Sequence, residues 1–385
     1  MPSEADARTG AAESAPLTVG VEEEYLLVDP VTRQVSPRAH EVVADAAALL
    51  GPRVTTELTR FQVEVRSDPH TVLADLGEQL RHLRTVVARC ALRHGVRIIS
   101  SGSPVLAPPL PPPITEGARY ARSVERFRAL DDEQSACACH VHIGVPDPAQ
   151  ALLLSNHLRP WLPVLISLSA NSPYWAGRST GYASWRTMVW ARWPAAGPPP
   201  YFASPAHFED LVGDLTASGA VMDRGGLYWD IRPSHHVPTL EVRVADAAQT
   251  VDDTLLFAAV VRALAADARD AVAAGTSAPR PAAELLRAAC WRAARDGLAG
   301  QGIDLSTARP VPAADLARRL LDRIAPVLAR HGDLDLVRRG FALLLSRGDG
   351  AERQRAAQRH GGGLHRVVDH LIVAAAGDWP VNSNT

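Results

Sequence analysis

Acidic side chains at alternate positions mark the first segment of this chain that could do chemistry. Residues 18–28, TVGVEEEYLLV, have the β-branched and apolar composition of a strand and place Glu22 and Glu24 on one face. Two carboxylates about 7 Å apart on one side of a strand repel each other unless a positive charge lies between them. A divalent cation supplies that charge in many enzymes, although a solvated acidic face explains this segment equally well when it is taken alone.

Four later strand-like segments repeat this mixture of carboxylates, imidazoles and arginines on one face. The segments are 57–67 (ELTRFQVEVRS), 138–145 (ACHVHIGV), 227–232 (LYWDIR) and 239–245 (TLEVRVA). Their opposite faces are apolar or aromatic, and in the first strand we exclude Glu23 because it points to that other face. Oxygen ligands with one or two imidazoles suit Mg²⁺ or Mn²⁺ better than Zn²⁺. The predicted metal ligands are Glu22, Glu24, Glu64, His140, His142 and Glu241.

Arginines on the same faces could bind a phosphate or a carboxylate through two parallel hydrogen bonds. We predict this role for Arg232 and Arg243, because metal and arginine on one surface are what phosphoryl transfer requires. Arg186, in the irregular segment 171–200, is a further candidate for a phosphate contact, and a solvated loop arginine is the more ordinary interpretation. The chain contains 40 Lys and Arg residues, all of them Arg, which excludes Schiff-base chemistry and a P-loop lysine.

Two ordinary explanations compete with a functional interpretation of the histidine and cysteine residues. A His140/His142 pair by itself is as often structural or solvated as it is a ligand. The same spacing occurs in metal-dependent amidohydrolases, but there it follows the first strand of a (β/α)8 barrel and is often joined by a bridging lysine. Cys137 and Cys139 are too close together for a zinc site of their own, so we expect small core residues.

Length and composition are those of a soluble globular protein that carries little net charge. The chain has 385 residues, 46% hydrophobic and 21% charged, with a formal net charge of −2. We therefore expect neither nucleic acid nor a membrane as partner, and no apolar run reaches the roughly 20 residues of a membrane span. The first 16 residues lack the features of a secretory signal and are predicted to be a disordered leader. Four cysteines without framework spacing favour the cytoplasm.

The strands alternate with helices, so the elements predict an α+β fold. A mainly antiparallel sheet has one polar face and helices that back its apolar face, unlike the all-apolar strands of a doubly wound fold. Helices are predicted at 41–50, 73–94, 119–130, 149–170 and 211–218, a short strand at 96–101, and an almost wholly helical region at 252–376. The predicted divisions are a leader at 1–16, a catalytic sheet domain at 17–250, a helical portion at 251–376 packed on the same domain, and a tail at 377–385.

Several long motifs resemble the carboxylate–amine ligase family, also called the type 2 glutamate–cysteine ligase family. In order, they are TVGVEEEYLLVDP, QVEV, ISSGSP, ERFRAL, CACHVHIGV, LSANSPYWAGRSTGYASWR, RWPAAGPPP, YWDIRPS and TLEVRVAD, and together they extend from about residue 18 to 246. This chain departs from the family pattern at Arg66, where a small residue is expected, and at Ala138, which replaces a glycine. Arg66 shares a face with Glu64, so it could bind a second carboxylate or compete with a metal.

The resemblance implies a glutamine-synthetase-like fold, with ATP and Mg²⁺ or Mn²⁺ bound on the concave face of a curved sheet. It also implies that the γ-phosphate of ATP passes to a carboxylate and that an amine attacks the resulting acyl phosphate. Arg232 and Arg243 would stabilise the transferred charge, and Asp230 would orient an arginine or accept a proton from the amine. Glutamate and cysteine are the default substrates by resemblance.

Two other functions remain open at this point. One is a metal-dependent amide hydrolase that uses the same residues without a nucleotide, and the other is a non-catalytic relative that binds a nucleotide or metabolite. The apolar helical stretch 152–170 could also serve a homodimer interface.

Overall fold

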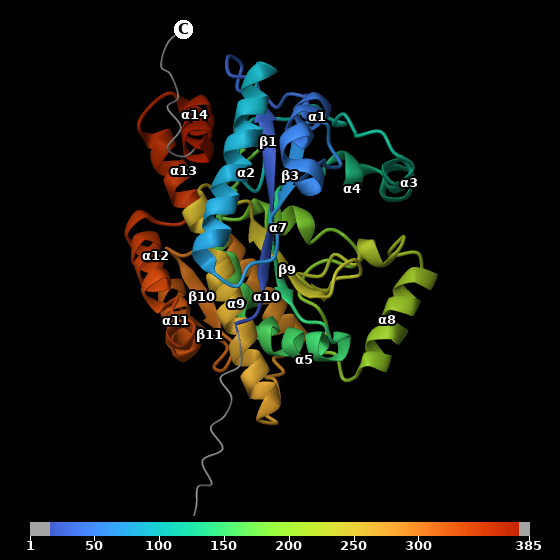
Figure 1. The fold of residues 1–385 in the computed structure, drawn as a ribbon, viewed down its shortest axis with the longest axis vertical. Helices are drawn as coiled ribbons and strands as arrows, with labels where there is room; N and C mark the ends of the chain where they lie inside the picture. Colours follow the sequence, from blue (N-terminus) through green and yellow to red (C-terminus); the bar gives the residue numbers. More distant parts are fainter. Residues whose placement is uncertain (1–15, 377–385) are drawn as a thin grey trace, which may run out of the picture.

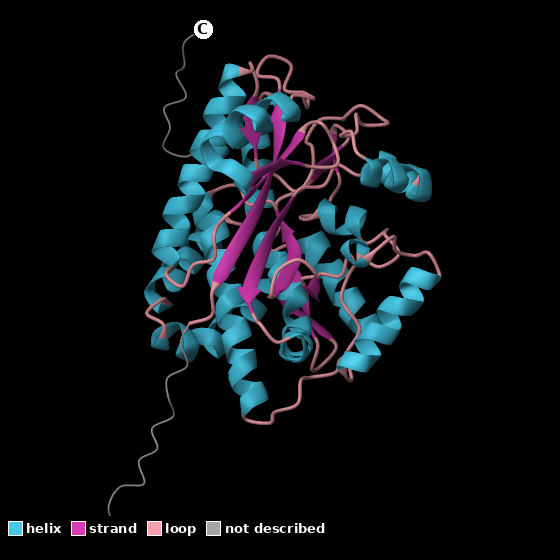
Figure 2. Cartoon of the chain, turned by 45° about the vertical axis from the view of Figure 1, so that its right-hand side comes forward, coloured by secondary structure: helices cyan, strands magenta, loops and turns pink. Residues whose placement is uncertain are grey.

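A seven-stranded antiparallel sheet forms the centre of the molecule (Figures 1 and 2). This computed structural model describes residues 16–376. The strand order is β2-β3-β1-β5-β9-β8, with β4 paired to the end of β1 on the edge opposite β3, and every pairing between these named strands is antiparallel. The strands are β1 Val19–Val28, β2 Val54–Thr56, β3 Gln62–Arg66, β4 Arg97–Ile99, β5 Ala138–Gly144, β8 Ile231–Pro233 and β9 Thr239–Asp246.

Helices make up most of the remaining described chain. Their bounds are α1 Ala39–Leu50, α2 Leu73–Arg93, α3 Ala118–Phe127, α4 Ala129–Asp132, α5 Pro148–Leu158, α6 Leu162–Ser169, α7 Trp185–Trp190, α8 Pro205–Ala217, α9 Val251–Ala273, α10 Ala283–Asp296, α11 Ala313–Arg330, α12 Leu334–Arg347, α13 Gly350–Arg359 and α14 Gly363–Ala376. The ends follow local chemistry: Thr250 and Asp253 form a capping box that starts α9, and Gly95, at φ 71°, follows α2.

The apolar face of the sheet is covered by helices, and the other face is left for polar side chains. Residues of β1 such as Val19, Val21 and Tyr25 belong to the main core cluster together with residues of α2, α5, α6 and α9. In Figure 2 the strands cross the middle of the molecule, with many of these helices on one side and α3 and α8 set apart on the other.

Antiparallel register brings the chemically interesting positions side by side. Glu24 is opposite Glu64 in the β1–β3 pair, and Glu22 is opposite His140 in the β1–β5 pair. His142 is in turn opposite Glu241 in the β5–β9 pair. Because paired residues in neighbouring strands are about 5 Å apart, one continuous band of ionisable groups crosses the sheet.

Several sequence-based assignments of elements are corrected by the structure, among them the strand predicted at 227–232, of which only the last two residues belong to β8. The predicted strand 57–67 is interrupted, because the chain turns between β2 and β3. The predicted helix 149–170 is divided into α5 and α6 by a 3₁₀ turn at Arg159–Trp161, beside Pro160 and Pro163. The irregular segment 171–200 contains α7 and a small hairpin, β6 Tyr174–Trp175 with β7 Arg178–Ser179. The C-terminal region contains a second hairpin, β10 Gln301–Asp304 with β11 Arg309–Pro312.

The apolar stretch 152–170 gives no support to a dimer interface. Leu154, Leu158, Leu162 and Leu165 are fully buried in the core of the same chain.

Among the described residues, no helix is long and apolar enough to cross a membrane. The predicted leader, apart from Pro16, and the predicted tail lie outside the described residues. The division at residue 250 stays a prediction.

Candidate active site

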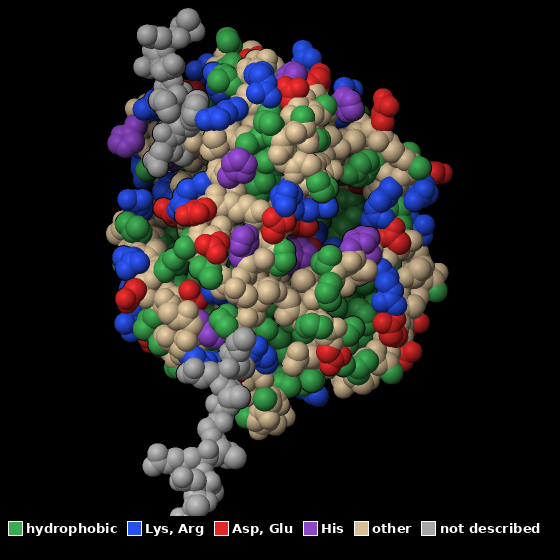
Figure 3. Space-filling model, viewed as in Figure 1, with side chains coloured by type: hydrophobic (Ala, Val, Ile, Leu, Met, Phe, Trp, Pro, Cys, Tyr) green, Lys and Arg blue, Asp and Glu red, His purple; other side chains and the backbone are tan. Residues whose placement is uncertain are grey.

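A cavity of about 250 Å³ opens on the polar face of the sheet. Figure 3 shows arginine, acidic and histidine side chains around a hollow in the right half of the molecule. The lining combines charged groups from the sheet with aromatic and polar groups from the segments that face it. The lining residues include Glu22, Glu24, Glu57, Gln62, Glu64, Arg119, Tyr120, Asp131, Gln134, His140, Arg186, Trp190, Trp193, Tyr228 and Arg243.

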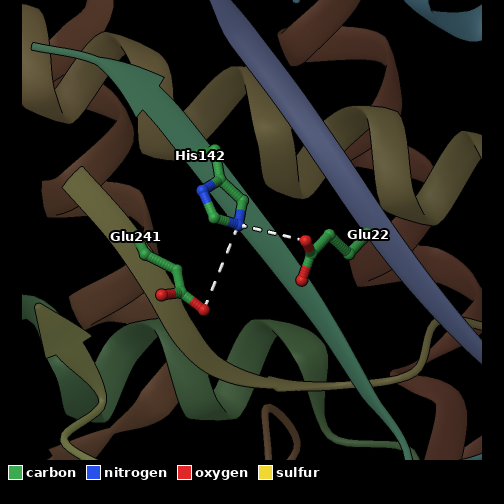
Figure 4. A group of neighbouring side chains, drawn as sticks. All are labelled: Glu22, His142 and Glu241. Atoms are coloured by element: carbon green, nitrogen blue, oxygen red, sulfur yellow. Dashed lines mark ion pairs between the residues drawn. The ribbon is translucent and has the colours of Figure 1, made fainter. Parts of the chain in front are cut away.

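One group of predicted metal ligands lies where β1, β5 and β9 are adjacent (Figure 4). Glu22 lies 3.1 Å from His140 Nδ1 and 3.6 Å from His142 Nε2, which is 4.0 Å from Glu241. Glu22, His142 and Glu241 each offer a ligand atom within 4.8 Å of the others. Burial acts to raise the pKa of Glu22, but the adjacent imidazoles of His140 and His142 hold the pKa well below its usual value. The buried Nε2 atoms of His140 and His142 have no hydrogen-bond partner.

Two arginines hold Glu241 in place. Arg232 Nε donates to one carboxylate oxygen at 2.8 Å, and Arg243 Nη1 donates to the other. Burial acts to raise the pKa of Glu241, but Arg243 and Arg232 lower it far below its usual range. Arg232 also donates to the Leu227 carbonyl oxygen at 2.6 Å, so its guanidinium is fixed beside the sheet and does not line the cavity. Of this pair, Arg243 lines the cavity and Arg232 does not.

A second acidic group, formed by Glu24, Glu57 and Glu64, lies at the β1–β3 side of the cavity. Burial, and then the neighbouring Glu64, raise the pKa of Glu24 to about 8. Burial, and then Glu24, raise the pKa of Glu57 to about 7. Burial and Glu22 raise the pKa of Glu64 well above its ordinary value, even though Arg66 Nε donates to Glu64 at 2.7 Å. Because the half-exposed Arg66 is one cation beside three carboxylates, of which Glu24 and Glu64 are buried, this group can accept a further positive charge.

Arg186 corrects the expectation of a solvated loop arginine. Its side chain is buried, with Nη2 donating to the carbonyl oxygen of Arg243 at 3.0 Å. The guanidinium carbons of Arg186 and Arg243 lie 5.5 and 5.8 Å from the centre of the Trp190 ring. Both arginines line the cavity and lie against the same indole ring. This geometry favours an anionic group positioned between the two arginines and the acidic residues.

Asp230 is buried behind these two arginines and does not line the cavity. Burial raises its pKa to about 7, while Arg186 and Arg243 act in the opposite direction. The position is suited to orienting the arginines, which is one of the two roles predicted for Asp230.

Glu23 takes no part in the cavity, as its facing predicts. It is buried on the opposite side of β1, where Arg84 Nε donates to it at 2.9 Å and Thr254 of α9 also donates. Cys137 and Cys139 are buried, as expected of small core residues, and Gln62 Nε2 donates to Cys137 Sγ at 3.3 Å.

Sequence reasoning missed Glu57, Asp131 and the aromatic residues of the cavity. Glu57 was missed because face alternation was extended from Glu64 through a segment that turns. Asp131 comes from the short helix α4, which no periodicity singled out. Tyr228 lies in a loop that the sequence assigned to the strand 227–232, because only Ile231–Pro233 form β8. The clustering of Trp and Tyr in 182–193 was a usable signal that something other than a solvated loop lies there.

Comparison with known proteins places the chain in a family. The model of glutamate-cysteine ligase family 2 matches residues 18–370. A Mycobacterium sp. (strain KMS) protein named "Putative glutamate–cysteine ligase 2-2" is 50% identical over 365 residues, which cover 93% of this chain and 98% of the relative. A Nocardia farcinica protein named "Putative glutamate–cysteine ligase 2-1" is 47% identical over 340 residues, 88% of each chain. The chain belongs to glutamate–cysteine ligase family 2.

Solved structures share the fold at low sequence identity. The glutamate–cysteine ligase of Francisella tularensis in complex with AMP has a TM-score of 0.69 at 15% identity, over 94% of this chain and 89% of that one. A bifunctional glutathione synthetase of Pasteurella multocida has a TM-score of 0.71 at 15% identity, over 94% of this chain and 53% of that one. The predicted glutamine-synthetase-like α+β fold is confirmed.

Proposed function

We propose that this protein is an ATP-dependent carboxylate–amine ligase, with glutamate and cysteine as the default substrates. The observation that carries the proposal is the cavity itself, in which buried carboxylates face two arginines that share Trp190. The family and the names of its members support the reaction class. Such a cavity fits a triphosphate, because arginines and carboxylate-bound cations together neutralise its charge.

The donor set fits divalent cations. Glu24 and Glu64 are buried carboxylates with the partly buried Glu57 beside them, and Glu22 with the histidines offers further oxygen and nitrogen donors. We assign Mg²⁺ or Mn²⁺ to these groups, with Glu241 more firmly held by its two arginines than the other ligands. When bound, the cation would neutralise phosphate charge and align the phosphoryl group with the attacking oxygen.

The chain's own residues would act mainly by position and charge. A substrate carboxylate oxygen attacks the γ-phosphorus of ATP, ADP leaves, and an acyl phosphate forms. The amine nitrogen then attacks the acyl carbon, phosphate leaves, and the nitrogen loses a proton. Arg243 and Arg186 would stabilise the negative charge on the transferring phosphoryl group, because both line the cavity. Asp230, buried behind them, would keep the guanidinium groups in place.

The test is ADP release from the purified protein with Mg²⁺ or Mn²⁺, over pairs of amino acids. We expect release that needs both a carboxylate and an amine, and its loss in Glu24→Gln. A matched control is Glu78→Gln, which changes an exposed glutamate on α2. If a folded protein forms no ADP with any pair of amino acids, the proposal is contradicted. Amide cleavage without nucleotide would instead identify a hydrolase, and Mg·ATP binding without turnover a binding protein.

Small-molecule substrates and ATP are the partners that this function requires. The expected site of action is therefore the cytoplasm, where ATP is abundant.

A further inference from the structure

A second cavity, of about 450 Å³, lies between the last three helices of the described chain. Its walls come from α12, α13 and α14, and its lining shares no residue with the candidate active site. Figure 1 shows these three helices together at the left of the molecule, whereas α3 and α8 lie at the right. The second cavity is therefore a separate place in the fold.

Positive charge is in excess in the lining of this cavity. Each of the three helices supplies one arginine: Arg347 from α12, Arg353 from α13 and Arg366 from α14. The acidic residue of the lining is Asp369, and its carboxylate already accepts a hydrogen bond from Arg33 Nε at 3.0 Å. Like charges held on three neighbouring helices repel one another, and an anion between them would remove that repulsion.

The three arginines keep donors that nothing else uses. Arg353 Nη2 donates to Asp253 at 2.9 Å, but the Nε atom of Arg353 is buried and has no hydrogen-bond partner. Within residues 16–376, neither Arg347 nor Arg366 forms an ion pair with a carboxylate. A guanidinium group offers five N–H donors and can bind a phosphate through two of them at once.

Arginines from two of these helices act on the same point of the lining. Burial, followed by Arg353 and Arg366, lowers the pKa of His370, so this ring carries no charge near neutral pH. Its Nε2 atom lies 3.4 Å from Gln249 Oε1, which holds the ring in place. Arg353 and Arg366 thus place their charges near one buried wall of the cavity.

Apolar side chains lie between the basic groups. Ala356 and Ala357 of α13 and Val373 of α14 belong to the lining, and Val373 is 55% exposed. Sites for small organic molecules have volumes of roughly 300–1,000 Å³, and this cavity lies within that range. Arginines beside a partly apolar surface fit an anion that carries an organic group.

We propose that the cavity between α12, α13 and α14 binds a small organic phosphate, a monoester with two negative charges near neutral pH. The phosphate would contact Arg347, Arg353 and Arg366, and the organic group would lie against the two alanines and Val373. This binding site does not depend on the proposed ligase reaction.

The experiment is titration calorimetry of the full-length protein with phenyl phosphate and with inorganic phosphate, without metal or nucleotide. We expect one phenyl phosphate per chain at this site, bound about 10-fold more tightly than inorganic phosphate because the ring buries apolar surface. Raising NaCl from about 50 to about 300 mM should weaken binding, since the lining is partly exposed. No binding of phenyl phosphate, or equal affinity for the two probes, overturns the proposal.

Arg347→Gln and Arg366→Gln should each weaken phenyl phosphate binding by about 10- to 100-fold, the range for a hydrogen bond to a charged group. Matched controls are Arg338→Gln on α12 and Arg359→Gln on α13, which change exposed arginines outside the lining and should keep wild-type affinity. Wild-type affinity in both Arg347→Gln and Arg366→Gln would place the ligand elsewhere and overturn the proposal. An equal loss in the controls would mark general charge attraction and overturn it as well.

Thermal unfolding separates a loss of binding from a loss of folding. Arg347→Gln and Arg366→Gln should leave the melting temperature unchanged or higher, because each removes one of several like charges. Should one of the two fail to fold, the other carries the comparison. Since the titration needs no turnover, a phosphate site without ADP release supports this proposal and counts against the ligase, and ADP release without a phosphate site does the reverse.

Discussion

Glu23 and Glu24 are neighbours in the sequence, yet Glu23 stabilises the folded chain and Glu24 destabilises it. Glu23 is paired with Arg84 inside the helical layer, and Glu24 lies among carboxylates in the cavity. Burial acts to raise the pKa of Glu23, but Arg84 lowers it, so this carboxylate is ionised. Removing one partner of a buried ion pair leaves the other charge uncompensated.

We therefore predict that Glu23→Gln lowers the free energy of unfolding by about 3–5 kcal/mol. Near pH 7, Glu24→Gln should instead raise the stability of the metal-free protein, because Glu24 must take up a proton on folding and a glutamine need not. Denaturant unfolding followed by circular dichroism measures both. Equal effects of the two substitutions would contradict the assignment of faces.

The pH dependence of the metal-free protein follows from the raised pKa of Glu24. Its value of about 8 in the folded chain exceeds the ordinary 4.5, so the folded state holds a proton that the unfolded state releases. Stability should fall as pH rises from about 4.5 towards 8, by up to about 1.4 kcal/mol per pH unit for one group. Urea titrations at pH 6 and pH 8 measure this slope. Glu24→Gln should flatten it, and a slope unchanged in that variant would count against the assignment.

At the scale of elements, the end of β9 secures the segment that carries Arg186. Asp246 accepts hydrogen bonds from Asn171 N at 2.8 Å, Ser172 Oγ at 2.7 Å and Ser184 Oγ at 2.8 Å. Ser172 Oγ in turn accepts from the backbone N–H of Arg186 at 3.0 Å. Asp246 is therefore a positioning residue for the arginine side of the cavity.

We expect Asp246→Ala to lower the free energy of unfolding by about 3 kcal/mol, since it leaves buried donors unpaired. The same change should reduce kcat for ADP release, because the backbone that positions Arg186 loses its anchor. Asp246→Asn, which keeps one acceptor, should recover much of both properties. Unfolding curves and steady-state kinetics of the two variants give the comparison, and wild-type kcat in Asp246→Ala would refute the positioning role.

Alternation along regular strands was a sound guide to facing in β1, β5 and β9. Alternation assigned Glu22, His140 and Glu241 to one face of the sheet, because each of these strands keeps its period of two residues. Alternation failed at Glu57, where the chain turns before β3. It does not apply to Asp131, which lies on the helix α4. Arg186 was misjudged because the sequence did not reveal that it lies on the short helix α7, with its side chain against β9.

At the scale of the molecule, ligands that bind only the folded protein must stabilise it. Mg·ATP at 100 times its Kd should raise the free energy of unfolding by about 2.7 kcal/mol. Glu24→Gln should lose most of this increase, and Glu78→Gln should retain it. Thermal unfolding with and without Mg·ATP measures the shift, and chelation of the metal should reverse it. An equal shift in both variants would place the nucleotide elsewhere.

The sequence by itself determined the strand faces, the absence of lysine chemistry and, through its ordered motifs, the family and fold. These features depend on residue type and on short, regular spacing, which the chain carries locally. Only the tertiary structure decided which groups share the cavity. Glu57 joins Glu24 in the cavity lining, and Arg186 donates to the carbonyl oxygen of Arg243 on β9, because distant segments pack together and packing is set by the whole chain.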